Sequence, residues 1–238
     1  MQPYFVVSLA ILGIAHAEGN APTCQQFMKE MSDEMRLDFL KKHNRYRSKL
    51  ALGHVVIGEE PPNSLPYNLT YAHTASKMMD LEYDCDLEKS AYRSAEKCHH
   101  VASSSEKYDE NVYVIKDTSL YNVALRIEKM MAINSWTSET FYINQTAESV
   151  PYLSNNTISN FANVAWETHS KLGCAVFKCY EGKITVVCHY APRVKKNDEA
   201  IYTVGKPCKE CGPDFFCHRD VGLCENFTQA AYQSQDIH

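Results

Sequence analysis

The stretch from Ser159 to Pro192 constrains the fold more than any other part of the chain, because it combines three cysteines with a dense alternation of apolar residues. Residues 173–176 and 184–188 are rich in β-branched and apolar side chains and are predicted to be strands. Between them, Gly182 permits the positive φ that a tight hairpin needs. Strands that are apolar on both faces are normally covered on both. We therefore expect a central antiparallel sheet between two helical layers.

The beginning of the chain has the features of a secretory signal peptide. Residues 1–14 form an apolar run without Lys or Arg, and the small residues Ala15 and Ala17 occupy the positions that a signal peptidase reads. The run is too short to span a bilayer, and no similar run follows it. We therefore expect residues 1–17 to be removed and the mature chain from Glu18 to be secreted and soluble.

Length and charge narrow the class of protein further. A chain of 238 residues is long enough for one well-buried core and a small appendage. We expect a main domain, residues 18–192, followed by a connector, a cysteine-rich hinge and a tail in residues 193–238. The formal net charge of −5 comes without a basic stripe, which argues against a nucleic-acid partner.

All ten cysteines follow the signal peptide, and an even number in a secreted chain indicates five disulfides. Zinc is the competing interpretation for the last four cysteines, but an oxidising compartment favours disulfides. Residues 208–224 have too few apolar side chains to build a core, so crosslinks are expected to hold them. Spacing alone does not determine which cysteines pair.

Four Asn-x-Thr sequons agree with secretion. Each places its own stretch of chain at the surface if it carries a glycan. The acceptor residues are Asn68, Asn144, Asn155 and Asn226.

A first helix is predicted from Ser32, whose hydroxyl can cap it, to about Leu50. One side of this helix carries the polar residues His43, Asn44 and Arg47. They suit either a catalytic set or a hydrogen-bond network that holds nearby loops, and buried polar groups more commonly serve the second purpose.

The positions of Gly and Pro and the spacing of apolar residues predict the remaining elements of the main domain. Residues 53–68 contain several Gly and Pro and are expected to form a loop without regular structure. Helices are predicted from about Thr70 and from Asp84, and a strand over 109–114. A last helix is predicted from Ser119, with Met131 in its buried stripe. Beyond the main domain, residues 191–207 are expected to be an extended connector.

Several short motifs together resemble the CAP (SCP/TAPS) superfamily in their order and spacing. They are His43-Asn44 with Arg47, Asp84 with Leu87, Ala91, Ala95 and Cys98, Glu110-Asn111, Trp136 with Glu139, Trp166, Gly173-Cys174-Ala175 and Val187-Cys188-His189-Tyr190. The resemblance covers nearly the whole mature chain. It implies an α+β fold, a three-layer α-β-α sandwich, with a small C-terminal cysteine-rich hinge extension.

The box Asp84-Cys85-x-Leu87-Glu88 and the leader are similar to the activation-associated secreted proteins of hookworms and related parasitic nematodes, in particular to the branch that inhibits neutrophils and platelets. Resemblance to the family also implies a disulfide pairing. The expected pairs are Cys24 with Cys85, Cys98 with Cys179, Cys174 with Cys188, Cys208 with Cys217 and Cys211 with Cys224.

Family members with an intact central cavity hold two histidines and two glutamates there. In this chain Ala102 and Asn160 stand at the histidine positions, whereas Glu110 and Glu139 remain. Two carboxylates without imidazoles make a poor site for zinc, so no metal and no cofactor is expected. His99 and His100 lie close in sequence to Ala102 and are the alternative nitrogen donors.

Three functions from different classes follow. The resemblance and the lost histidines favour a non-enzymatic, secreted effector that binds a host protein, with an integrin-type adhesion receptor as the partner and Arg219 and Asp220 as candidate contacts. A lipid or sterol carrier is the alternative, since other family members bind such ligands. A hydrolase that uses Glu110 and Glu139 as acid and base is the second alternative, although no motif supplies a nucleophile with a positioned base.

Overall fold

The computed structural model describes residues 24, 31–58, 69–103, 107–116, 131–152, 158–194 and 199–227. The expected signal peptide and most of the helix predicted from Ser119 lie outside these residues. No helix in the described ranges is long and apolar enough to cross a membrane.

The centre of the molecule is a sheet with the strand order β3-β6-β7-β4. Its middle strands, β6 (Lys171–Lys178) and β7 (Ile184–Ala191), pair antiparallel and confirm the predicted hairpin. Gly182 in the turn has a φ of +73°. On the outer sides, β4 (Asp109–Ile115) pairs antiparallel with β7, and β3 (Glu82–Tyr83) pairs parallel with β6.

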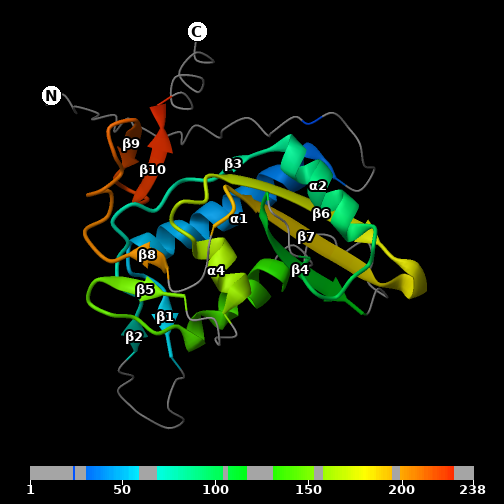
Figure 1. The fold of residues 1–238 in the computed structure, drawn as a ribbon, viewed down its shortest axis with the longest axis horizontal. Coiled ribbons are helices and arrows are strands. Elements are labelled where there is room, and N and C mark those ends of the chain that lie inside the picture. The colour runs from blue at the N-terminus through cyan, green and yellow to red at the C-terminus, as the bar shows by residue number, and fades with distance from the viewer. Residues whose placement is uncertain are drawn as a thin grey trace, which may run out of the picture.

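Helices cover both faces of this sheet, as Figure 1 shows, with α2 (Cys85–Ala95) on one side and α1 (Asp33–Ala51) and α4 (Ser159–Ala165) towards the other. The Ser32 hydroxyl accepts from the amide of Met35 at the start of α1, as predicted. A carboxylate oxygen of Asp84 caps α2 in the same way. The expected three-layer sandwich is confirmed.

Short elements complete the fold beside the central sheet. Two two-stranded antiparallel sheets form, one from β1 and β2 and the other from β5 and β8. The bounds of the short elements are Val56–Ile57 for β1, Thr70–Tyr71 for β2, Ser149–Pro151 for β5, Ala200–Thr203 for β8, Glu139–Tyr142 for the 3-10 helix η1 and Tyr180–Gly182 for η2.

The prediction of a helix from about Thr70 is wrong, since the chain there forms β2 and then an irregular segment. Its backbone amides bond to carbonyl groups far away in the sequence, which a helix would not allow. These bonds run from Ala72 to Val55, from Ala75 to Ala51, from Ser76 to Thr203 and from Met79 to Glu167. Distant partners therefore override the local pattern.

Three further details differ from expectation. Residues 53–68 were expected to lack regular structure, but β1 forms within them. Met131 is 44% exposed rather than buried, because Ala132, Ile133 and Trp136 face the core on that helical stretch. The connector contains β8, whose Ile201 and Tyr202 are completely buried.

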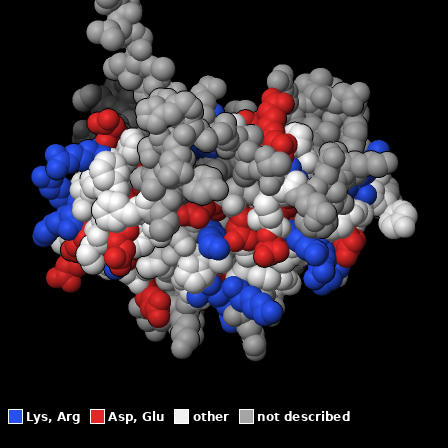
Figure 2. All heavy atoms as spheres, turned by 90° about the horizontal axis from the view of Figure 1, so that it is seen from above, with Lys and Arg blue, Asp and Glu red and all other residues white. Residues whose placement is uncertain are grey.

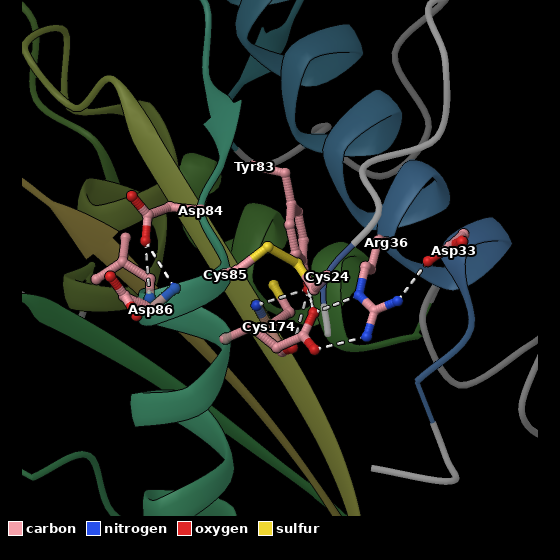
Figure 3. The surroundings of a disulfide bond; sticks show 10 residues. Cys24, Asp33, Arg36, Tyr83, Asp84, Cys85, Asp86 and Cys174 are labelled. Carbon is pink, nitrogen blue, oxygen red and sulfur yellow. Dashed lines mark hydrogen bonds and ion pairs between the residues drawn. A yellow bond between two sulfur atoms is a disulfide. The ribbon is translucent and has the colours of Figure 1, made fainter. Parts of the chain in front are cut away.

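Five disulfides crosslink the chain, and no free cysteine remains. The pairs are those that the family resemblance implies: Cys24 with Cys85, Cys98 with Cys179, Cys174 with Cys188, Cys208 with Cys217 and Cys211 with Cys224. The first of them lies beside Tyr83 and joins the start of the chain to α2 (Figure 3).

The cysteine-rich hinge is a small antiparallel hairpin of β9 (Phe215–His218) and β10 (Leu223–Asn226). Both hinge disulfides are internal to it, so the hinge is attached to the main domain only by the chain and by non-covalent contacts. Leu223 is buried in the core of the main domain, and the amide of Cys224 donates to Met78 at 2.8 Å. The hinge is therefore packed against the domain.

Two carboxylates, those of Asp80 and Glu225, lie near each other at this junction. Glu225 is 8% exposed, and Asp80 donates its own amide to the carbonyl of Cys224. Burial, followed by the negative charge of Glu225, raises the pKa of Asp80 to about 7. The positive charge of Arg47 lowers that pKa, but by less than either burial or Glu225 raises it. Glu82 adds further negative charge.

We expect this junction to weaken as the pH rises. A carboxyl group whose folded-state pKa is raised stabilises the fold below its unfolded value, near 3.8, and loses that contribution as the pH passes about 7. Asp80→Asn should remove the effect, so the loss of unfolding free energy between pH 5 and pH 8 should shrink by about 2 to 3 kcal/mol. Denaturant titrations of both proteins at the two pH values measure it, and an identical pH dependence would contradict the assignment.

Candidate functional site

A buried histidine lies among the candidate site residues. His189, on β7, is completely buried, and its Nε2 lies 2.7 Å from a carboxylate oxygen of Glu110 on β4. Its Nδ1 lies 2.6 Å from the hydroxyl of Ser90 on α2. Tyr108 stacks on the imidazole, with ring centroids 3.7 Å apart. The group connects α2 to the edge of the sheet.

The protonation states within this group follow from its surroundings. Burial lowers the pKa of His189 more than Glu110 raises it, which favours a neutral imidazole. Burial raises the pKa of Glu110, but hydrogen bonds from His189, Ser94 and the amide of Ser103 outweigh burial and lower it. The ionised carboxylate therefore accepts the Nε2 proton, and Nδ1 is left to accept from Ser90.

The structure pairs the Ser90 hydroxyl with His189, a contact that no sequence motif indicated. Such a pair can activate a nucleophile, but the side chains of His189 and Glu110 are only 0% and 1% exposed. The Ser90 hydroxyl also lies 3.0 Å from the carbonyl of Leu87 in its own helix. We interpret the group as a connection between α2 and the sheet, since a substrate cannot reach a base that is enclosed on all sides.

Glu139, at the start of η1, holds the first turn of α4. One of its carboxylate oxygens accepts from the side-chain amide of Asn160 at 2.7 Å, and the other accepts from the backbone amide of Phe161 at 2.8 Å. The backbone N–H groups of a first helical turn have no partner within the helix, so this carboxylate satisfies one of them. Burial raises the pKa of Glu139 above its ordinary value.

The two glutamates therefore have separate structural roles, although the structure brings the expected cavity residues together. Asn111, next to Glu110, donates to the carbonyl of Asn160, which binds Glu139. Ala102, the remaining one of the four expected cavity residues, is exposed. It directly precedes Ser103, whose backbone amide donates to Glu110. Opposite pKa shifts are typical of an acid and base pair, but hydrogen bonds already occupy both carboxylates.

The donors present do not fit the zinc site of the family. The side chain of Ala102 has no atom that can bind a metal ion. The side-chain amide of Asn160 donates a hydrogen bond to Glu139, and the carboxylate of Glu110 is hydrogen-bonded to His189. Within the described part of the chain, no group of three or more His, Cys, Asp or Glu side chains is arranged to hold a metal ion. His99 and His100 are exposed, so neither reaches into the cavity as a substitute ligand.

We predict that the dialysed protein retains far less than one zinc ion per chain. Introducing Ala102→His with Asn160→His should add zinc binding, and adding His189→Ala should strengthen it because that change frees Glu110. Elemental analysis after dialysis measures the metal content, with the single variant Ala102→His as the control. A full equivalent of zinc in the wild type that disappears in His99→Ala or His100→Ala would contradict this prediction.

The polar stripe of α1 forms a structural network, as the more common of its two interpretations predicted. His43 contacts the hydroxyl of Tyr190 at 2.9 Å, and burial lowers its pKa to about 4. Asn44 exchanges two hydrogen bonds with the backbone of Leu81. Arg47 donates to backbone carbonyls of residues 79, 164, 166, 167 and 169, so it gathers several loops around one guanidinium group.

The candidate partner contacts lie apart from the cavity. Arg219 and Asp220 are exposed in the turn between β9 and β10, which two disulfides hold. Among the sequons, Asn144 is exposed and Asn226 is half-buried at the end of β10. Asn68 and Asn155 lie outside the described residues. Glycan occupancy at all four positions stays a prediction.

Comparison with known proteins agrees with this geometry. The family model described as the cysteine-rich secretory protein family, CAP, matches residues 40–190. Hookworm platelet inhibitor 1 of Ancylostoma caninum is 40% identical over 211 residues, which cover 89% of each chain. A solved structure titled Hookworm Platelet Inhibitor has a TM-score of 0.64 and 36% identity, covering 85% of this chain and 96% of its own.

A second relative is longer than this chain. Ancylostoma secreted protein, also of Ancylostoma caninum, is 33% identical over 202 residues, which cover 82% of this chain and 45% of the relative. The similarity therefore concerns about half of that protein.

Proposed function

Because this chain belongs to the CAP family of cysteine-rich secretory proteins, we propose that it is a secreted parasite protein that acts outside the cell by binding a host protein, and that it is not an enzyme. The observation that carries the proposal is its similarity to a platelet inhibitor over 89% of both chains. The engaged carboxylates of Glu110 and Glu139 support the non-enzymatic part. The partner class is a cell-surface adhesion receptor of the integrin type.

The β9–β10 turn is the proposed contact surface. Arg219 and Asp220 present opposite charges at its tip, and the hinge disulfides limit how many conformations the turn adopts. A turn that is ordered before binding loses less conformational entropy on binding.

The proposal predicts that the protein reduces adhesion of neutrophils or platelets to fibrinogen, and that Arg219→Ala weakens this inhibition by at least about fivefold. Arg93→Ala is the matched control, because Arg93 is an exposed arginine on α2 in the main domain. Adhesion would be counted with each protein over a range of concentrations. No inhibition by the wild type in either assay contradicts the function, whereas equal inhibition by wild type and Arg219→Ala contradicts only the contact surface.

A further inference from the structure

The turn between β6 and β7 carries an unusually exposed aromatic side chain. This turn, which contains η2, projects from the body of the molecule at the far end from the hinge (Figure 1). Tyr180, the first residue of η2, is 94% exposed, the largest value among the exposed large hydrophobic side chains of the described residues. An exposed aromatic ring is the kind of side chain that anchors protein interfaces.

The backbone beneath Tyr180 is fixed by several constraints. A disulfide joins the preceding residue, Cys179, to Cys98 in the turn that follows α2. The amide of Cys179 donates to the carbonyl of Lys183 at 2.8 Å and closes the turn, in which Gly182 adopts its positive φ. The ring is therefore presented by a preorganised loop, which lowers the entropy lost on binding.

Two clefts adjoin the ring. The first has a volume of about 170 Å³, and its lining includes Val114 and Thr185. The second has a volume of about 500 Å³, and its lining includes Phe177 and Glu96. Cys179 and Tyr180 line both clefts, so a partner that receives the ring also meets both recesses.

The surroundings of the ring are basic, although the whole chain has a net charge of −5. Three lysines, Lys97, Lys178 and Lys183, lie next to the clefts or the disulfide, whereas Glu96 lines one cleft and Glu181 follows Tyr180 in the sequence, so lysines outnumber carboxylates around the ring. Figure 2 shows uncharged atoms projecting beside Lys and Arg side chains at the right-hand end of the molecule. Such a surface is complementary to an acidic one.

We propose that Tyr180 and these basic side chains form a docking surface for a folded extracellular protein that offers a pocket for the tyrosine ring within a rim of carboxylates. This inference rests on the proposed function, since it assigns a surface to the binding of a host protein. It lies on a different part of the fold from the β9–β10 turn, so the two surfaces can be tested separately.

The test is binding of the labelled full-length protein to intact platelets and neutrophils. Tyr180→Ser should weaken binding by at least about tenfold, and Lys178→Glu with Lys183→Glu should weaken it and reduce its dependence on salt. Tyr142→Ser is the matched control, because Tyr142 is a 61% exposed tyrosine on η1 and should change affinity less than about twofold. Circular dichroism and the mass of the non-reduced protein check the fold of each variant.

The outcomes separate the inference from the function on which it rests. Equal binding of wild type and Tyr180→Ser contradicts this surface and leaves the proposed function intact. No binding by the wild type contradicts both. Binding of the wild type to protein-free vesicles of phosphatidylserine and phosphatidylcholine, lost in Tyr180→Ser, would assign the tyrosine to a membrane and would overturn the protein partner.

Discussion

Replacing Arg36 with methionine should lower the free energy of unfolding by about 3 to 5 kcal/mol, because the change leaves a buried carboxylate without its cation. Arg36 is 1% exposed, and its guanidinium donates to both carboxylate oxygens of Glu88, at 2.7 and 2.8 Å. Glu88 is completely buried and also accepts from the hydroxyl of Tyr83. Figure 3 shows Arg36 between Asp33 on its own helix and the first turn of α2.

A double-mutant cycle separates the ion pair from the packing around it. Replacing both partners, Arg36→Met with Glu88→Leu, should cost less than the sum of the two single changes, because neither charge is then left unpaired. Lys171→Met is the matched control, since Lys171 is 51% exposed and its ion pair with Asp84 should contribute less than about 1 kcal/mol. Denaturant titrations with the disulfides intact measure the wild type, the two single variants, the double variant and the Lys171→Met control. Equal costs for Arg36→Met and Lys171→Met would contradict the interpretation.

Gly173→Ala should destabilise the protein by about 3 kcal/mol or more, or prevent its secretion. Gly173 lies on β6 directly beneath α2, and an added Cβ would lie 2.2 Å from the backbone nitrogen of Glu88 and 2.4 Å from the carbonyl carbon of Leu87. A rigid helical backbone cannot yield as a side chain can, so α2 would have to move. That movement would also separate Glu88 from Arg36.

Gly58→Ala is the control for this prediction. Gly58 has a φ of +78° and nothing within 4 Å of an added Cβ, so the change costs only the backbone strain, about 1 kcal/mol. Secreted yield and the midpoint of denaturation compare the two variants with the wild type. A Gly173→Ala protein as stable as Gly58→Ala would show that α2 does not pack on β6 as closely as described.

The elements that sequence reasoning predicted well have local causes. The helix from Asp84 begins with a capping carboxylate and has small residues at the positions that face the sheet, and α2 confirms it. The hairpin of β6 and β7 follows from two apolar runs around a glycine turn. The irregular segment after Thr70 was missed because its partners, such as Thr203 and Glu167, are remote in sequence.

The candidate site shows the same division between local and remote causes. Family resemblance identified Glu110 and Glu139, but His189 was not recognised as part of the site. A lone histidine on an apolar strand gives no local signal, and its partners Ser90 and Glu110 lie on two other elements. Only the alternation of β7, which turns residue 189 towards α2, would have identified it.

The measurement that tests the central claim most directly is binding of the purified, glycosylated protein to immobilised ectodomains of platelet and leukocyte integrins. The account predicts saturable, reversible binding to at least one of them with a Kd below about 1 µM, with neither protein cleaved or modified. Absence of binding to every integrin tested at about 10 µM protein, which corresponds to less than about 7 kcal/mol of binding free energy, would contradict it.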